Sequence, residues 1–191
     1  MPLEEPLVLA SQSPRRGEIL RQAGIPFVVR ASAVDETPRH QERPEEYVQR
    51  LAAEKALAVE ASLEEIVLAA DTTVVVDGRI FGKPVDLREA RHMLIRLAGR
   101  RHEVLTGICL RRGHRIVRDW AATQVWFSSL SRREIAEYVA SGEPMDKAGA
   151  YAIQGIASRY VQRIEGCYFN VMGLPISLVY QHLRRLRSSP G

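Results

Sequence analysis

The apolar run Ile66–Ala70 is the feature that most restricts the fold of this chain. It contains no polar side chain, a pattern typical of a strand that is buried on both faces of a sheet. The run ends at Asp71, and Val74–Val76 then resumes it before Asp77-Gly78, a pair that favours a hairpin turn. We therefore predict a central strand with a carboxylate at its end.

Helices and further strands alternate along the rest of the chain. Strands are expected at Leu7–Ala10, Phe27–Val29, Ile80-Phe81, Val104–Leu110, Ile116–Phe127 and Tyr160–Ile164. Helices are expected at Pro14–Ala23, Pro44–Ala61, Leu87–Ala98, from Ser131 to Ser141, and at Leu174–Leu186. Two hairpins interrupt the alternation, so we predict an α/β fold with a mixed, elongated and curved sheet that is flanked by helices. A single domain over residues 1–191 is expected, with a frayed tail after Arg187.

Composition restricts the class of protein. A chain of 191 residues with 46% hydrophobic composition is long enough to bury a core. No stretch approaches the ~18 apolar residues of a membrane span, and the acidic N-terminus differs from a signal peptide, so we expect a cytoplasmic protein without a membrane partner.

The net charge of +4 lies in separate groups without interleaved aromatic residues, which predicts solvated faces rather than a nucleic-acid surface. Cys109 and Cys167 lack metal-ligand spacing and are expected to be small buried residues.

The predicted first helix begins with an unusual charge. Ser13 is its expected N-cap and Pro14 its first residue, yet Arg15 and Arg16 follow where acidic side chains would suit the helix dipole. A helix N-terminus offers backbone N–H groups to an anion, and arginine adds bidentate donors that match phosphate oxygens. The pattern therefore indicates a phosphate site, with two arginines that simply face water as the alternative.

Lys55 interrupts an apolar stripe. In the predicted second helix, Val48, Leu51, Ala52, Lys55 and Val59 share one face. A lysine at such a position either extends outward to water or meets a buried anion, and the sequence leaves both open.

Two acidic residues are candidates for catalysis or metal binding. Asp71 ends a buried strand, which is where α/β proteins often build sites, and it suits the orientation of a water or a divalent ion. The alternative is an aspartate that caps a turn by accepting from the backbone of Thr73. Glu36 lies in an early loop and is either a second such acid or a solvated side chain.

Two loop residues complete the candidates. Lys83 stands between a glycine and a proline that stiffens the loop, as suits a fixed cation near phosphate. Gln154 lies in a segment of small residues, and its amide offers a donor and an acceptor that match a base edge. Each is otherwise an ordinary polar loop residue.

Long segments resemble the Maf family of nucleoside triphosphate pyrophosphatases. They are "LASQSPRRGEIL", "VDET", "EKA", "AADTTVVVDGRIFGKP", "HEVLTGI", "SGEPMDKAGAYAIQG" and "IEGCYFNVMGLP", in this order over nearly the whole chain. "DKAGAYAIQG" resembles the branch that acts on dTTP and UTP, whereas the branch for 7-methyl-GTP differs there. The resemblance implies a fold similar to inosine triphosphate pyrophosphatases, often as a homodimer. It also implies cleavage between the α and β phosphates, aided by a divalent metal, with Mg or Mn expected.

The resemblance also implies roles for individual residues. Asp71 matches the catalytic base or metal-organising carboxylate, with Glu36 as a second candidate metal ligand. Positions tied to substrate choice match Arg15, Thr72 and Gln154, and phosphate-binding positions match Ser11, Arg16, Lys55 and Lys83. Ala152 replaces a glycine that is usual in the branch, and its methyl group is expected to narrow the pocket or shift the Gln154 loop. The expected activity is hydrolysis of dTTP, UTP and modified pyrimidine nucleotides, and the alternative is a non-enzymatic, nucleotide-binding regulator of cell division.

Overall fold

The computed structural model describes residues 6–31 and 33–188. The acidic N-terminal residues 1–5 and the tail 189–191, about which the sequence raised expectations, lie outside the described residues. Among the helices that the structure describes, none is long and apolar enough to cross a membrane.

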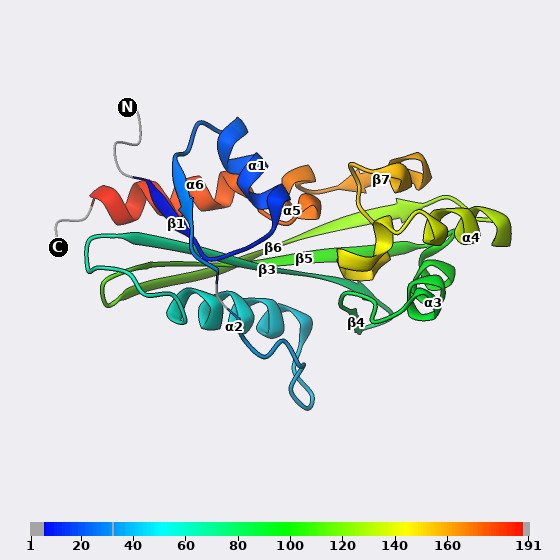
Figure 1. Ribbon diagram of the computed structural model, residues 1–191, viewed down its shortest axis with the longest axis horizontal. Helices are drawn as coiled ribbons and strands as arrows, with labels where there is room; N and C mark the ends of the chain where they lie inside the picture. Colours follow the sequence, from blue (N-terminus) through cyan, green and yellow to red (C-terminus); the bar gives the residue numbers. More distant parts are fainter. Residues whose placement is uncertain (1–5, 32, 189–191) are drawn as a thin grey trace. The chain divides into compact units, whose positions relative to one another are not determined.

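A seven-stranded mixed sheet organises the chain (Figure 1). The strands are β1 (Leu7–Leu9), β2 (Phe27–Val29), β3 (Ile66–Val76), β4 (Arg79–Phe81), β5 (Arg101–Arg112), β6 (Arg115–Phe127) and β7 (Val161–Glu165). Their order is β2-β1-β3-β5-β6-β7, and β4 pairs with β3 beside this path. β1 is parallel to β2 and β3, while β4 and β7 pair antiparallel to β3 and β6. The predicted mixed sheet flanked by helices is therefore confirmed.

The contacts divide the chain into two compact units. Unit 1 contains residues 1–71, 106–121 and 173–191, and unit 2 contains residues 72–105 and 122–172. The long strands β3, β5 and β6 each contribute residues to both units. The prediction of one domain over residues 1–191 stays a prediction.

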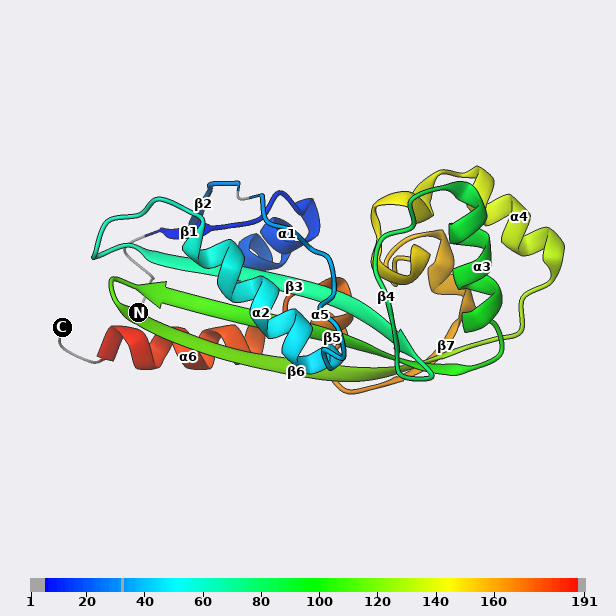
Figure 2. The same ribbon diagram turned by 90° about the horizontal axis from the view of Figure 1, so that it is seen from below.

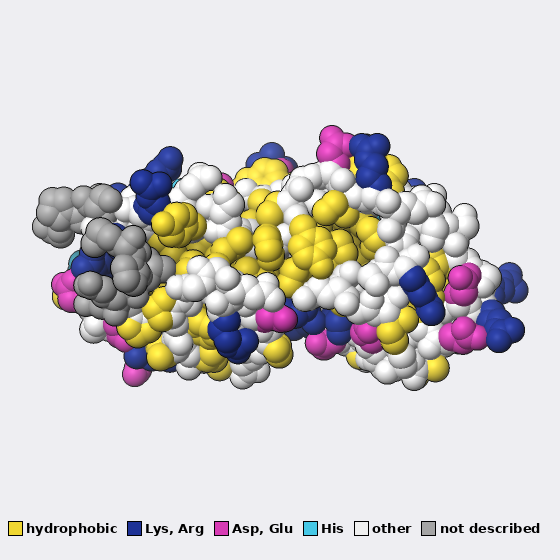
Figure 3. Space-filling model, turned by 90° about the horizontal axis from the view of Figure 1, so that it is seen from above, with side chains coloured by type: hydrophobic (Ala, Val, Ile, Leu, Met, Phe, Trp, Pro, Cys, Tyr) yellow, Lys and Arg dark blue, Asp and Glu magenta, His cyan; other side chains and the backbone are white. Residues whose placement is uncertain are grey.

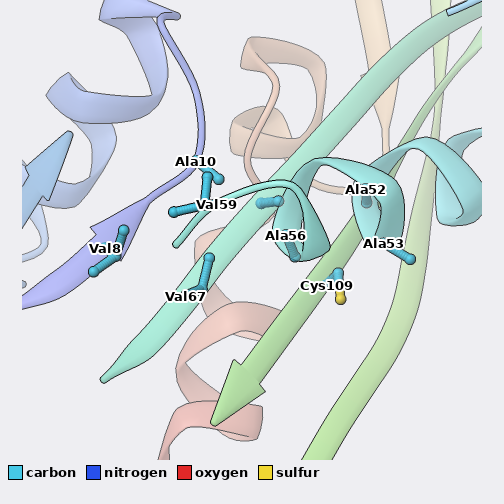
Figure 4. Close-up of a cluster of buried hydrophobic side chains, with 9 residues drawn as sticks. Val8, Ala10, Ala52, Ala53, Ala56, Val59, Val67 and Cys109 are labelled. Carbon is cyan, nitrogen blue, oxygen red and sulfur yellow. The ribbon is translucent and has the colours of Figure 1, made fainter. Parts of the chain in front are cut away.

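Unit 1 is built around helices α1 (Pro14–Gln22), α2 (Pro44–Leu57) and α6 (Ile176–Ser188). Figure 1 shows α2 and α6 on opposite faces of this part of the sheet. Small side chains fill the space beneath α2, among them Ala52, Ala56 and Cys109 (Figure 4). The contact is close enough that a Cβ on Gly107 of β5 would lie 2.3 Å from the carbonyl oxygen of Val48. Backbone therefore meets backbone where α2 crosses the sheet.

Unit 2 carries the remaining helices. They are α3 (Leu87–Leu97), α4 (Arg132–Ala140), α5 (Tyr168–Met172) and the 3₁₀ turns η1 (Glu143–Asp146), η2 (Ala148–Ala150) and η3 (Ile156–Tyr160). α3 packs against α4 and η2, and Figure 2 shows the two α-helices near each other. α4 begins with a capping box, in which Ser131 and Glu134 exchange hydrogen bonds. This unit thus consists largely of short elements joined by turns.

Some sequence-based boundaries were wrong. α2 ends at Leu57 instead of Ala61. Beyond its end, the carbonyls of Val59 and Glu60 accept hydrogen bonds from Arg111 and Arg30, at 2.7 and 3.0 Å, so distant residues hold this segment. The short helix α5 was not predicted.

The two cysteines differ in burial. Cys109 is fully buried as predicted, whereas Cys167 is only half-buried. The backbone N–H and carbonyl of Cys167 both bond to the Thr123 hydroxyl, at 3.0 Å each. The backbone of Cys167, rather than a buried thiol, therefore holds it to β6.

The charged side chains on the face drawn in Figure 3 form separate groups of both signs. Arg112 pairs with Glu64 at 2.7 Å, and Arg96 and Arg100 both pair with Asp77, at 3.1 and 2.7 Å. These pairs are exposed or half-exposed, where ion pairs contribute little to stability. They fit the interpretation of the basic groups as solvated faces.

Candidate active site

Asp71 lies within β3 rather than at its end. The strand runs without interruption from Ile66 to Val76, so the predicted strand end at Asp71 and the alternative of a turn-capping aspartate are both wrong. Thr72 and Thr73 have enough β propensity to continue the strand between the two apolar runs. Asp71 is consequently buried, with 6% of its surface exposed.

Lys55 is the ionic partner of Asp71. It shares the buried face of α2 with Val48, Leu51 and Ala52, and its Nζ lies 2.6 Å from Oδ1 of Asp71. The same Nζ lies 2.6 Å from Oε1 of Glu36. Of the two alternatives that the sequence left open, the structure shows a lysine that meets a buried anion.

Glu36 reaches this point from an exposed loop. Its backbone carbonyl accepts a hydrogen bond of 2.9 Å from the Tyr47 hydroxyl, which attaches the loop to α2. Burial, followed by the nearby Asp71 and Glu36 carboxylates, raises the pKa of Tyr47, so this hydroxyl stays a neutral donor. The Glu36 side chain is 45% exposed and hence open to solvent and ligands.

Burial changes the proton affinity of Asp71. Desolvation raises the pKa of Asp71 above its ordinary value of 3.8, and the charges of Lys55 and Arg16 oppose that rise. The charge of Glu36 adds to the rise. Asp71 is therefore a better proton acceptor than an exposed aspartate while it remains paired with cations.

Arg16 is fixed on two sides at the start of α1. Its Nη1 donates to Oγ of Ser11 at 2.9 Å, and its Nε donates to the carbonyl oxygen of Gly173 at 2.9 Å. Burial lowers the pKa of Arg16, Asp71 opposes this change, and the charge of Arg15 lowers the pKa further. The alternative in which both arginines simply face water is wrong for Arg16. Arg15, one residue earlier, is partly buried.

The start of α1 has the predicted position but a different cap. Ser13 precedes Pro14 as expected, yet its side chain makes no capping hydrogen bond to this helix. Its backbone N–H donates to Oγ of Ser11 at 3.2 Å. The first turn of this described helix also contains no acidic residue, so its positive end has no carboxylate of its own.

The other predicted residues lie in unit 2. Thr72 is partly exposed on β3, and Lys83 is exposed in the loop after β4. The carbonyl oxygen of Gly82 accepts from the Gly149 backbone N–H at 3.0 Å, which connects the Lys83 loop to the segment that leads to Gln154. Gln154 is exposed in a turn.

The structure thus groups the candidates by unit. Unit 1 brings together Ser11, Arg15, Arg16, Glu36, Lys55 and Asp71, and unit 2 contains Thr72, Lys83 and Gln154. Two residues of unit 1 were missed by sequence reasoning, namely Tyr47 and Gly173. Gly173 stands in the segment "NVMGLP", and the match of this segment to the family could have indicated that Gly173 supports the site. Nothing in the sequence marked Tyr47.

Glu36 and Asp71 suit a divalent metal in part. Within residues 6–31 and 33–188 no cluster of three or more His, Cys, Asp or Glu side chains forms a complete metal site. The two carboxylates nevertheless reach one cationic centre, the Lys55 ammonium. Mg²⁺ is commonly held by one or two carboxylates together with substrate phosphates, so this donor set fits an ion that arrives with a phosphate ligand.

Known proteins are similar to this chain over nearly its whole length. A dTTP/UTP pyrophosphatase of Symbiobacterium thermophilum is 54% identical over 178 residues, which cover 93% of this chain and 92% of that protein. A dTTP/UTP pyrophosphatase of Koribacter versatilis is 48% identical over 180 residues, covering 94% of this chain and 93% of that protein. A HAM1 protein from Coxiella burnetii shares the fold, with a TM-score of 0.51 and 14% identity over 94% of this chain and 98% of that chain. The family model for Maf-like proteins matches residues 6–186, and the chain therefore belongs to the Maf family.

Proposed function

We propose that this protein is a nucleoside triphosphate pyrophosphatase that hydrolyses dTTP and UTP to the monophosphate and pyrophosphate. The observation that carries this proposal is the similarity to relatives named dTTP/UTP pyrophosphatase, at 54% and 48% identity over more than nine tenths of the chain. Modified pyrimidine nucleotides are further candidate substrates.

The charges of unit 1 suit a triphosphate. Arg16 and Arg15 stand at the positive end of α1, and Lys55 is buried beside two carboxylates. Preorganised cations of this kind stabilise the charge that develops on a leaving pyrophosphate. We assign phosphate binding to Ser11, Arg16, Lys55 and Lys83, with Ser11 holding the Arg16 guanidinium in place.

Asp71 is the proposed general base. Burial moves the pKa of Asp71 upward, toward neutral pH. The carboxylate is therefore better able to remove a proton from an attacking water. The water oxygen forms a bond to the α phosphorus, the bond to the bridging oxygen breaks, and pyrophosphate leaves with the bonding electrons. Lys55 keeps the Asp71 carboxylate ionised and oriented for this step.

A divalent cation, Mg²⁺ or Mn²⁺, is the proposed cofactor, with Glu36 and Asp71 as its protein ligands. When bound, it neutralises phosphate charge and makes the phosphorus more electrophilic. Glu36 is the more exposed of the two acids and is open to an ion that enters with the nucleotide. The Asp71 carboxylate has one oxygen besides the one bonded to Lys55, and this oxygen would either ligate the ion or accept the proton of the attacking water.

Selection of the nucleotide is assigned to Arg15, Thr72 and Gln154. Gln154 is exposed, and its amide offers both a donor and an acceptor to a base edge. Ala152, two residues earlier, accepts a backbone hydrogen bond of 3.2 Å from Gly155, so its methyl group lies at the start of the same turn. The resemblance further suggests a homodimer, and the sequence composition and charge pattern favour a cytoplasmic protein without a nucleic-acid partner.

A nucleotide panel tests the proposed function. The purified protein is incubated with Mg²⁺ or Mn²⁺ and UTP, dTTP, CTP, ATP, GTP, 7-methyl-GTP or modified pyrimidine triphosphates, while pyrophosphate release is measured. We expect the highest kcat/KM for UTP and dTTP, and loss of turnover when EDTA removes the metal. Nucleotide binding without turnover would contradict the proposal and support the non-enzymatic regulator.

A further inference from the structure

Gln154 lies at the tip of a tight turn, which we name the Gln154 turn, residues Ala152–Gly155. The Gly155 N–H donates to the carbonyl oxygen of Ala152 at 3.2 Å and closes this turn. Ile153 is 8% exposed and anchors one side of it, whereas Gln154 is exposed. A side chain at the tip of a turn keeps a fixed position only if both ends of the turn are held.

Glu143 of η1 holds the end that follows Gln154. Its Oε2 accepts a hydrogen bond of 3.0 Å from the Ile156 backbone N–H. Its Oε1 accepts from the Tyr138 hydroxyl at 2.9 Å. A carboxylate that accepts two well-placed hydrogen bonds makes a stiff connection, because each bond fixes one of its oxygens.

Tyr138 holds the end that precedes Gln154. Its ring is buried in α4, with 1% of the residue exposed, and its hydroxyl receives a backbone hydrogen bond from Ala152. Burial and the bond to Glu143 raise the pKa of Tyr138, so the hydroxyl remains protonated and donates to Glu143. One chain of hydrogen bonds therefore runs from Ala152 through Tyr138 and Glu143 to Ile156.

Gly155 makes room for this connection. A Cβ at Gly155 would lie 2.3 Å from Oε1 of Glu143, which is shorter than any ordinary contact. A side chain at position 155 would displace the Glu143 carboxylate from both of its donors. The glycine is thus part of the same support.

We infer that Glu143, together with Tyr138, is a positioning residue that sets nucleotide selectivity by fixing Gln154. This inference rests on the proposed function and on the assignment of Gln154 to base selection. Glu143 acts through the turn and carries no role in proton transfer or phosphate binding.

Glu143→Ala is the direct test. We expect KM for UTP and dTTP to rise about tenfold, since two hydrogen bonds that order the turn are lost, while kcat changes less than twofold. The preference for UTP over CTP in kcat/KM should fall by a similar factor. Glu137→Ala is the matched control: Glu137 forms an exposed ion pair with Arg133, and its loss should leave both parameters unchanged.

Two further variants separate positioning from folding. Tyr138→Phe keeps the buried ring and removes only the hydroxyl, so it should lower the same preference by about threefold. Glu143→Ala should have no further effect on selectivity in a Gln154→Ala background, because the proposed action runs through Gln154.

The outcomes are distinct. A wild-type protein without turnover would overturn the proposed function and this inference with it. An active Glu143→Ala variant with unchanged selectivity, or one in which kcat for all nucleotides falls in parallel with thermal stability, would overturn this inference alone. Additive effects of Glu143→Ala and Gln154→Ala would also overturn it.

Discussion

Two regions of the molecule hold their functional side chains in different ways. In unit 1, the charged group of Arg16, Glu36, Lys55 and Asp71 is positioned mainly by regular elements, since Lys55 projects from α2 and Asp71 from the middle of β3. In unit 2, the Gln154 turn is held by hydrogen bonds from Tyr138 and Glu143. The difference teaches that the charged group is built on a helix and a strand, whereas the turn proposed for base selection depends on side-chain hydrogen bonds that single substitutions can remove.

Asp71→Asn should have the largest effect and acts on the charged group. Removal of the proposed base is expected to lower kcat by about 10²–10⁴-fold. Pyrophosphate release with UTP measures the loss, and circular dichroism checks the fold. Asp119→Asn is the matched control, because Asp119 pairs with His182 and has no proposed role in catalysis. Full activity in Asp71→Asn would show that Asp71 is not the base, and the charged group would then have no proposed chemical role to set it apart from the Gln154 turn.

Lys55→Met should lower the free energy of unfolding through its effect on the charged group. It leaves the buried Asp71 carboxylate without its lysine, which costs about 3 kcal/mol of unfolding free energy at pH 7. Urea denaturation measures the change. The double variant Lys55→Met with Asp71→Asn should recover much of the stability, because the unpaired buried charge is then gone. Equal stability of the single and double variants would contradict this explanation.

His102 tests the other region, close to the Gln154 turn. Its Nε2 lies 2.8 Å from the hydroxyl of Tyr151, the residue before the Gln154 turn, and burial lowers the pKa of His102 from 6.5 to about 3. Below pH 6.5 the unfolded chain therefore binds a proton at His102 that the folded protein does not. The stability that neutral His102 contributes is present above pH 6.5 and is lost as pH falls toward 3.

His102→Gln should flatten this pH dependence. The loss in the wild type is about 1.4 kcal/mol per pH unit inside that window, hence about 2 kcal/mol at pH 5. His102→Gln stays neutral and should lack this slope in urea denaturation between pH 7 and pH 5. His92→Gln, at an exposed position of α3, is the control and should keep the slope. Identical slopes in the wild type and His102→Gln would show that His102 is not held neutral.

Glu36→Gln should have the smallest effect and concerns the metal. Loss of one carboxylate charge is expected to raise the Mg²⁺ concentration for half-maximal activity by about tenfold, with a smaller change in kcat at saturating metal. A Mg²⁺ titration of UTP hydrolysis measures it. Glu64→Gln serves as control, because its side chain is 80% exposed and pairs with Arg112. An unchanged titration would assign Glu36 to the support of Lys55 alone.

Much of the fold could be predicted because local signals and tertiary packing agree. The hairpin pair Asp77-Gly78 adopts positive φ angles of 50° and 72°, and Ser131 caps α4 through its box with Glu134. The prediction was wrong where long-range contacts decide. The segment after α2 bonds through its carbonyls to Arg30 and Arg111, and no local pattern at Ala58–Ala61 encodes partners so far away in the chain.

The site followed the same rule. Lys55 could be singled out because it breaks an apolar stripe, and local patterns likewise indicated the arginine pair, the two acids and the two loop residues. The family resemblance added Ser11 and Thr72. The sequence did not show that Asp71 is internal to a strand, because a polar Asp-Thr-Thr triplet is equally compatible with a turn. It also gave no sign of Tyr47 or of the link from Tyr138 to Glu143, since these depend on side chains that meet only after folding.

The glycine beneath α2 has a consequence for the reaction. Because Gly107 lets the backbone of α2 rest directly on β5, main-chain contact sets the height of this helix above the sheet, and with it the point from which the Lys55 side chain extends. In the proposed reaction, a lysine that starts from this fixed point and is bonded to Asp71 would need little rearrangement. A side chain at position 107 would therefore push α2, and Lys55 with it, away from the sheet, although Gly107 is remote in sequence from every proposed catalytic residue.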